Sequence, residues 1–150
     1  MNVLDLFAGS GALGLEAASR GAAEVVLVEN NPEAVRVIEY NASVVGHPNT
    51  RVEPVKASTY LARAPRKHFD MVLADPPYEL IDEAVAEMVE ALKPTLRDGA
   101  VVVVERHRES PETAWPAEFT PTGQKLKKRL YGIARMDMAV YADPEAEVKD

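Results

Sequence analysis

Short apolar runs alternate with amphipathic stretches along most of the chain. The apolar runs are typical of strands buried on both faces and cover residues 3–7, 25–28, 51–55, 69–74 and 100–104. Between them, apolar residues at helical spacing predict helices at residues 11–20, 32–45, 58–63 and 81–96. Pro94 should kink or stop the last helix. The alternation predicts an α/β fold with a mostly parallel, doubly wound sheet.

The C-terminal third of the chain departs from this alternation. Residues 109–123 contain three prolines and are predicted to form a loop. Residues 124–130 and 133–141 are expected to pair as an antiparallel hairpin that closes the sheet. The sequence therefore predicts a parallel sheet with an antiparallel C-terminal edge.

Composition narrows the class of protein. The 150 residues suit a single domain, predicted to span residues 1–142, followed by a polar tail at residues 143–150, with order expected to be lost from residue 142. No apolar run nears the roughly 20 residues of a membrane span, and no signal-peptide pattern is visible, which predicts a cytoplasmic protein without a membrane partner. With no cysteine and three scattered histidines, the sequence predicts neither a disulfide framework nor a metal site.

The charge balance argues against a protein that coats nucleic acid unspecifically. The chain has 17 basic and 24 acidic residues, a net charge of −7, whereas phosphate binding needs clustered cations. Three basic clusters occur, at residues 63–68, 106–108 and 125–129. Each is either a local basic face or charge exposed to solvent on loops and an edge strand. In the third, Lys125, Lys127 and Arg129 would share one face of the predicted hairpin.

The tetrapeptide Asp75-Pro76-Pro77-Tyr78 is the strongest chemical signal. It follows the predicted strand at residues 69–74, at the carboxyl edge where open α/β sheets bind ligands. An aspartate can accept hydrogen bonds from an exocyclic amine, an aromatic ring can stack on a flat base, and prolines fix the backbone. The combination predicts methylation of an amine on a nucleic-acid base, with these four residues at the catalytic centre.

A glycine-rich turn lies between the first predicted strand and the first predicted helix. Residues 9–14 fit the pattern G-x-G-x-x-G, which permits a tight turn and close approach of a ligand to the backbone. Glu29 ends the second strand, close to the spacing of a carboxylate that binds ribose hydroxyls. Together they predict an adenosine-containing cofactor. The chain lacks the second mononucleotide-binding half that a dinucleotide spans, which favours S-adenosylmethionine over NAD.

The segment VLDLFAGSGALGLEA, residues 3–17, resembles the S-adenosylmethionine loop of the RsmD family, bacterial methyltransferases that modify guanine N2 in small-subunit (16S) ribosomal RNA. Residues 75–78 match the catalytic tetrapeptide of that family, and residues 125–141 resemble its closing hairpin. The resemblance implies a Rossmann-like class I S-adenosylmethionine-dependent methyltransferase, a monomer that acts on 16S rRNA or on the assembling small ribosomal subunit. Family members carry some tens of residues before this first strand, so the sequence is expected to lack an N-terminal RNA-docking arm.

The resemblance also implies roles for single residues. Asp75 and the carbonyl of Pro76 would hold the guanine amine, with Tyr78 stacked on the base. Glu29 would bind the cofactor ribose. The other residues implied to lie along the cofactor are Asp5, Phe7, Ala8, Gly9, Ser10, Gly11, Asn30 and Ala57. Lys56 departs from the family pattern, in which Asp or Asn usually stands there, and is not among the predicted site residues.

Two other interpretations stay open. The tetrapeptide also occurs in enzymes that methylate adenine N6 or cytosine N4 in DNA, although 150 residues leave no room for a separate target-recognition domain. The second is a truncated, non-catalytic domain that binds the cofactor but does not dock RNA. Methyl transfer to a defined base would separate both from the leading hypothesis.

Overall fold

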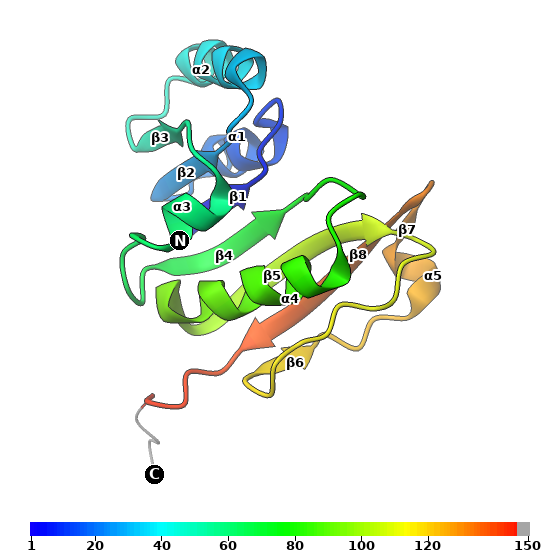
Figure 1. Ribbon diagram of the computed structural model, residues 1–150. Helices are drawn as coiled ribbons and strands as arrows, with labels where there is room; N and C mark the ends of the chain where they lie inside the picture. The colour runs from blue at the N-terminus through cyan, green and yellow to red at the C-terminus, as the bar shows by residue number, and fades with distance from the viewer. Residues whose placement is uncertain (147–150) are drawn as a thin grey trace.

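The computed structural model describes residues 1–146 and contains one sheet with helices on both faces (Figure 1). The strands are β1 (Asn2–Leu6), β2 (Glu24–Val28), β3 (Thr50–Glu53), β4 (Phe69–Ala74), β5 (Leu96–His107), β6 (Phe119–Pro121), β7 (Leu130–Tyr131) and β8 (Ala134–Tyr141). The helices are α1 (Ala12–Ser19), α2 (Pro32–Val45), α3 (Ala57–Leu61), α4 (Asp82–Leu92), the 3-10 turn η1 (Lys93–Thr95) and α5 (Leu126–Arg129).

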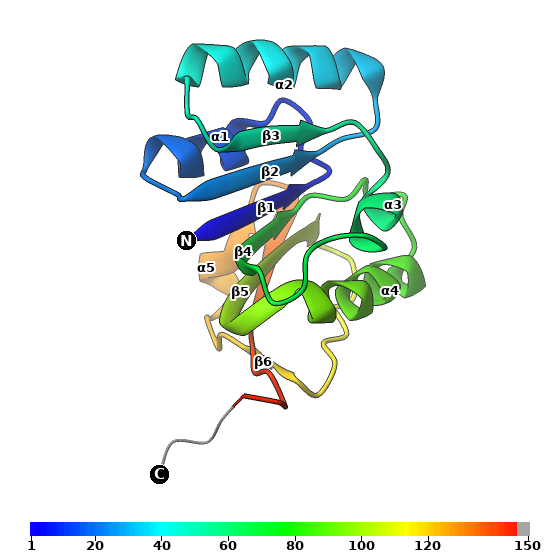
Figure 2. The same ribbon diagram turned by 90° about the vertical axis from the view of Figure 1, so that its left-hand side faces the viewer.

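The sheet has the strand order β3-β2-β1-β4-β5-β8-β6, with β7 paired to β8. The first five strands of this order run parallel, and β8 runs antiparallel to β5, β6 and β7 (Figure 2). The predicted fold, a mostly parallel sheet with an antiparallel C-terminal part, is confirmed. Its order reverses beside β1, so the carboxyl ends of β1 and β4 flank the crevice where such sheets bind ligands.

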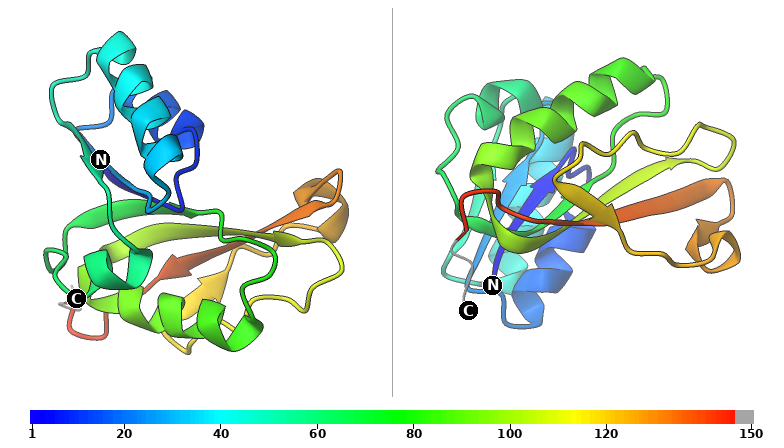
Figure 3. Two further views of the ribbon diagram at one scale, coloured as in Figure 1. Left: turned by 45° about the horizontal axis from the view of Figure 1, so that its top comes forward. Right: turned by 90° about the horizontal axis from the view of Figure 1, so that it is seen from below.

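Helices cover both faces of the sheet (Figure 3), and a hydrophobic core lies beneath the helices of each face. On one face, α3 and α4 cover a core that includes Leu4, Val72 and Leu92. On the other, α1 and α2 cover a smaller core that includes Val25 and Ile38. Alternate residues of the central strands enter each core, which explains why these strands appear as continuous apolar runs.

Helix α2 spans the predicted residues 32–45, and its ends show why. The side chain of Asn31 accepts hydrogen bonds from the backbone N–H groups of Glu33 and Ala34, at 2.9 and 3.2 Å. Gly46 closes the helix with a φ of 70°, a left-handed conformation that favours glycine. Pro94 has the predicted effect on α4, which ends at Leu92 in the 3-10 turn η1.

The predicted C-terminal hairpin is wrong in its first arm. Residues 126–129 form the helical turn α5, and only the two residues of β7 pair with β8. The Arg129 guanidinium is bonded to Glu112 at 2.8 Å and to the buried Asp137 at 3.0 Å, and these contacts hold the turn against the sheet. Lys125, Lys127 and Arg129 therefore do not share a strand face.

The predicted loop at residues 109–123 contains the short strand β6, in which Phe119 pairs with Tyr141. The chain after β8 also departs from expectation, because described residues beyond 142 contact the domain: Lys67 pairs with Asp143 and Glu145, at 3.2 Å each. The rest of the predicted tail, residues 147–150, lies outside the described residues.

Candidate active site

The glycine-rich turn folds tightly after β1. Phe7 and Gly9 both have positive φ values, 58° and 60°, and Gly11 has a φ of 81°. Gly14 is required for packing, because a Cβ there would lie 2.4 Å from the Leu27 side chain and 3.0 Å from the Asp5 carboxylate. Only glycine lets α1 approach the sheet this closely.

Glu29 ties this turn to the end of β2. One carboxylate oxygen accepts the N–H of Gly9 at 2.8 Å, and the other accepts those of Asn30 and Asn31 at 3.0 and 2.9 Å. A carboxylate offers about four acceptor positions, so Glu29 can accept one further donor. The loops after β1 and β2 are thus joined through one side chain.

A cleft of about 950 Å³ opens beside these loops and runs toward α4. Five of the predicted site residues line it, namely Phe7, Glu29, Asn30, Ala57 and Pro77. Its other walls include residues that the sequence did not single out, among them Val55, Leu61, Leu80 and Met88. Lys56, which departs from the family pattern and is not among the predicted site residues, also lines the cleft. Of the remaining predicted residues, Asp5 is buried within β1, and the others lie in the loops after β1 and β4 rather than in the cleft lining. The backbone N–H of Ala8, for example, donates to the carbonyl of Val28 at 3.0 Å.

The tetrapeptide continues directly from β4. The N–H of Asp75 donates to the carbonyl of Leu6 at 3.3 Å, which keeps Asp75 beside the end of β1. Pro76 is buried, whereas the three other residues of the tetrapeptide are exposed. The Tyr78 ring, 37% exposed, meets the ring of His107 edge to face with centroids 5.4 Å apart. The carboxylate and the aromatic ring are therefore both accessible to a ligand.

Carboxylates crowd this edge of the sheet. Asp5 is almost fully buried and accepts the N–H of Gly14 at 3.0 Å. Burial raises the pKa of Asp5 to about 7, against the lowering effect of the Gly14 hydrogen bond, and the charges of Asp75 and Glu29 raise it further. Asp5 therefore bonds the first turn of α1 from beneath the glycine turn.

Arg106 supports the loop that follows the tetrapeptide, a role that the sequence did not reveal. It is buried, and its Nη2 donates to the carbonyl of Leu80 at 3.3 Å and to Asp82 at 2.9 Å. Within residues 1–146 its buried Nη1 has no hydrogen-bond partner. The basic cluster at 106–108 is thus not uniformly exposed charge, because its first residue is an internal anchor.

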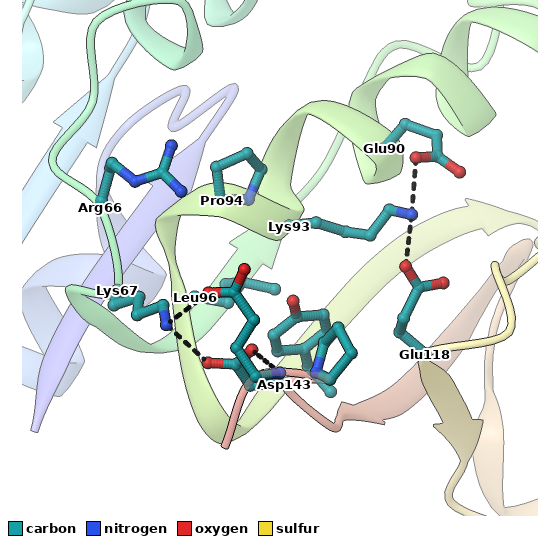
Figure 4. A pocket seen from close by; sticks show the side chains of 11 residues that line it. Arg66, Lys67, Glu90, Lys93, Pro94, Leu96, Glu118 and Asp143 are labelled. Carbon is teal, nitrogen blue, oxygen red and sulfur yellow. Dashed lines mark hydrogen bonds and ion pairs between the residues drawn. The ribbon is translucent and has the colours of Figure 1, made fainter. Parts of the chain in front are cut away.

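A second, smaller cleft of about 310 Å³ lies beside the amino end of β5 (Figure 4). Here Lys93 is bonded to Glu90 at 2.8 Å and to Glu118 at 2.7 Å. Lys67, on the other side, is bonded to Asp143 and Glu145. The cations of this cleft are thus paired with carboxylates of the same chain, except Arg66, for which no ion pair is found within the described part of the chain.

The described residues contain no candidate metal centre and no candidate membrane span. Across residues 1–146, no group of three His, Cys, Asp or Glu side chains is arranged to hold a metal ion. None of the helices in that range has the length and apolar character needed to cross a membrane.

The fold and the site can be compared with known proteins. A family model described as "Conserved hypothetical protein 95" matches residues 1–139. The chain belongs to this family. Ribosomal RNA small subunit methyltransferase D of Escherichia coli K12 is 34% identical over 125 residues, which cover 82% of this chain and 62% of that relative. The predicted relationship to the RsmD family is confirmed.

Other relatives agree with the family assignment. The Haemophilus influenzae protein of the same name is 31% identical over 135 residues, 87% of this chain and 66% of that relative. A Streptococcus pyogenes structure described as a conserved hypothetical protein is 32% identical, with a TM-score of 0.81 over 93% of this chain and 85% of that one. The fold is that of the class I methyltransferases, and this family member spans less than two thirds of the length of both curated relatives.

Proposed function

We propose that this RsmD-family chain transfers a methyl group from S-adenosylmethionine to the N2 amine of a guanine in 16S ribosomal RNA. The observation that carries the proposal is the position of the tetrapeptide: Pro77 lines the large cleft, and Asp75 stands beside the end of β1. The names of the relatives, ribosomal RNA small subunit methyltransferases, support the class of substrate.

The residues around the cleft fit the proposed cofactor. Its lining is largely apolar, with Phe7, Val55 and Leu61 available to pack against a flat adenine ring. Glu29 retains acceptor capacity for a ribose hydroxyl after bonding three backbone N–H groups. The sulfonium and ammonium groups of the cofactor are cationic, and the nearby carboxylates attract them.

When bound, S-adenosylmethionine supplies a methyl group on a positively charged sulfur, and the amine nitrogen that takes it must afterwards lose a proton. The lone pair of guanine N2 is delocalised into the ring, so the amine reacts poorly unless it is reoriented. Asp75 and the carbonyl of Pro76 each accept one N–H of the amine and turn its lone pair toward the cleft. Asp75 is also the acceptor for the departing proton.

Tyr78 supplies the platform for the base. Its exposed ring is available for stacking, a contact generally worth about 1–3 kcal/mol per base. A guanine within folded RNA must leave its stack to reach this ring. The cytoplasmic location and the monomeric state remain predictions.

The decisive experiment supplies labelled S-adenosylmethionine to small ribosomal subunits that lack their native methylation, followed by nucleoside analysis. Label in N2-methylguanosine is expected. Label in another nucleoside would replace the proposed base. A protein that binds S-adenosylhomocysteine but transfers no label would support the non-catalytic interpretation instead.

A further inference from the structure

Glu105 lies beside the tetrapeptide and has no part in the mechanism given so far. It follows Val104, the residue of β5 that pairs with Ala74 of β4. Ala74 and Val104 are both buried in the core beneath α4. Because side chains alternate along a strand, the next residues, Asp75 and Glu105, point to the opposite face at the same carboxyl edge.

The register of β4 and β5 places the side chains of Asp75 and Glu105 side by side at this edge. The hydrogen bond to Asp75, burial and the charge of Asp75 together raise the pKa of Glu105 to about 7. Burial, followed by the charges of Glu105 and Asp75, also raises the pKa of Tyr78. The two carboxyl groups and the proposed stacking ring thus face one region.

The bases that carry exocyclic amines differ in the ring atom beside the amine. In guanine, the N2 amine stands next to N1–H, so the N1 and N2 positions present donors side by side. In adenine and cytosine, the amine stands next to a ring nitrogen that accepts hydrogen bonds. Ionised carboxylates accept and do not donate, so a pair of them matches the guanine edge and repels the other two.

We propose that Glu105 selects guanine at this site by accepting N1–H of the same base whose N2 amine Asp75 holds. The inference rests on the proposed function and extends it, because it names the residue that distinguishes guanine from adenine and cytosine. Glu105, whose pKa is about 7 in the free protein, gives up its proton to water when the N1–H donor of the base takes its place. Glu105 is then a specificity residue that touches the base and leaves the methyl donor untouched.

The test reverses the hydrogen-bonding character on each side of the contact, on the base by removing the 6-oxo group and with it the N1 proton, and on the protein by replacing a carboxylate with an amide. The base analogue 2-aminopurine keeps the 2-amine but has an unprotonated N1, which accepts a hydrogen bond. Small subunits are reconstituted with 16S rRNA that carries guanosine or 2-aminopurine at the nucleotide where methylation is mapped. Methyl transfer by the full chain is measured for wild type, Glu105→Gln and Glu105→Ala, with Glu109→Gln as a matched control on an exposed loop.

Wild type is expected to prefer guanosine by about 10-fold or more, the discrimination typical of a paired base contact. The side-chain amide introduced by Glu105→Gln can donate to N1 of 2-aminopurine, so this variant should lower the preference by about 10-fold or more. Glu105→Ala should lose activity on guanosine without gaining on 2-aminopurine, and Glu109→Gln should keep the wild-type ratio. All four proteins should bind S-adenosylhomocysteine with equal affinity, which verifies that they are folded. The ratio of transfer to guanosine over transfer to 2-aminopurine does not depend on the amount of folded enzyme.

The outcomes separate this inference from the function on which it rests. If wild type forms no N2-methylguanosine, the proposed function is overturned and the role of Glu105 with it. If wild type does form it but Glu105→Gln retains the wild-type ratio, only the role of Glu105 is overturned.

Discussion

Charged side chains lie beside a cleft at the amino ends of the parallel strands (the amino edge) and also at their carboxyl ends (the carboxyl edge). The two edges differ in how these charges are paired. At the amino edge, Lys67 and Lys93 are each bonded to two carboxylates, which balance their charge within the chain. At the carboxyl edge, Asp5, Asp75 and Glu105 gather on one face, and none of the three forms an ion pair within residues 1–146.

This difference distinguishes structural charge from functional charge. A paired cation needs no ligand, because carboxylates of the same chain already balance its charge. Like charges held together without a cation oppose folding, and such arrangements concentrate at functional sites, where a ligand completes them. A cationic methyl donor and an N–H-rich base edge would both complement the carboxyl edge. Variants at the two edges test this contrast, and they differ in the size of the expected effect.

Replacing Asp75 should have the largest effect. Asp75→Ala removes an acceptor for the target amine and for its proton, so methyl transfer should fall by about 10²–10⁴-fold. Binding of S-adenosylhomocysteine should change little, because the proposed partner of Asp75 is the base. Labelled methyl transfer and calorimetric titration measure the two effects separately.

The control for this variant is Asp143→Ala at the amino edge, which should leave transfer unchanged. Loss of S-adenosylhomocysteine binding in Asp75→Ala would contradict the assignment of Asp75 to the base.

Glu29→Ala should weaken the cofactor site. It leaves three backbone N–H groups in the turns after β1 and β2 without their acceptor, and it removes the proposed ribose contact. The dissociation constant of S-adenosylhomocysteine should rise by about 10-fold or more, the effect of one charge-assisted hydrogen bond. Glu29→Gln keeps one acceptor oxygen and should recover part of the loss. Unchanged affinity in Glu29→Ala would show that the cofactor does not contact this carboxylate.

Asp5 gives a prediction about stability and pH. Its pKa is about 7 in the folded protein against 3.8 as the ordinary value, so the folded state holds the proton more tightly between these values. Stability from this group therefore falls as pH rises from about 4 to about 7. Asp5→Asn should remove that slope. The free energy of unfolding of the variant minus that of wild type should therefore be larger at pH 8 than at pH 5, by on the order of 1–4 kcal/mol.

Melting temperatures at the two pH values test this, and Asp143→Asn serves as a control whose difference from wild type should be the same at pH 5 and pH 8. The backbone N–H of Glu145, and after it Lys67, lower the pKa of Asp143 below its ordinary value of 3.8, so its contribution is fully present at both pH values and is lost only as pH falls through the lowered pKa. If the melting temperatures of wild type and Asp5→Asn changed in parallel with pH, burial would not be the dominant influence on the pKa of Asp5.

The features that could be predicted from the sequence are those fixed by neighbouring residues. Helix α2 has its own cap at Asn31, and strand β4 ends at the tetrapeptide, so both were found within their observed bounds. The turn α5 was missed because it depends on Arg129 reaching Glu112 and Asp137, contacts that no local pattern records. Glu105 also follows an apolar run, but only the register between β4 and β5 brings it beside Asp75.

The smallest effect is expected from a substitution at the amino edge. It tests most directly whether the paired charges there are purely structural. Lys93→Met removes the partner of Glu90 and Glu118 at a position where the lysine is only partly exposed. The melting temperature should fall by at most about 2 °C, since such ion pairs contribute little, and the difference should shrink in high salt. Methyl transfer and S-adenosylhomocysteine affinity should match wild type. A substantial loss of transfer with the fold intact would mean that the amino-edge cleft has a function of its own, and the division between paired structural charge and unpaired functional charge would not hold for this protein.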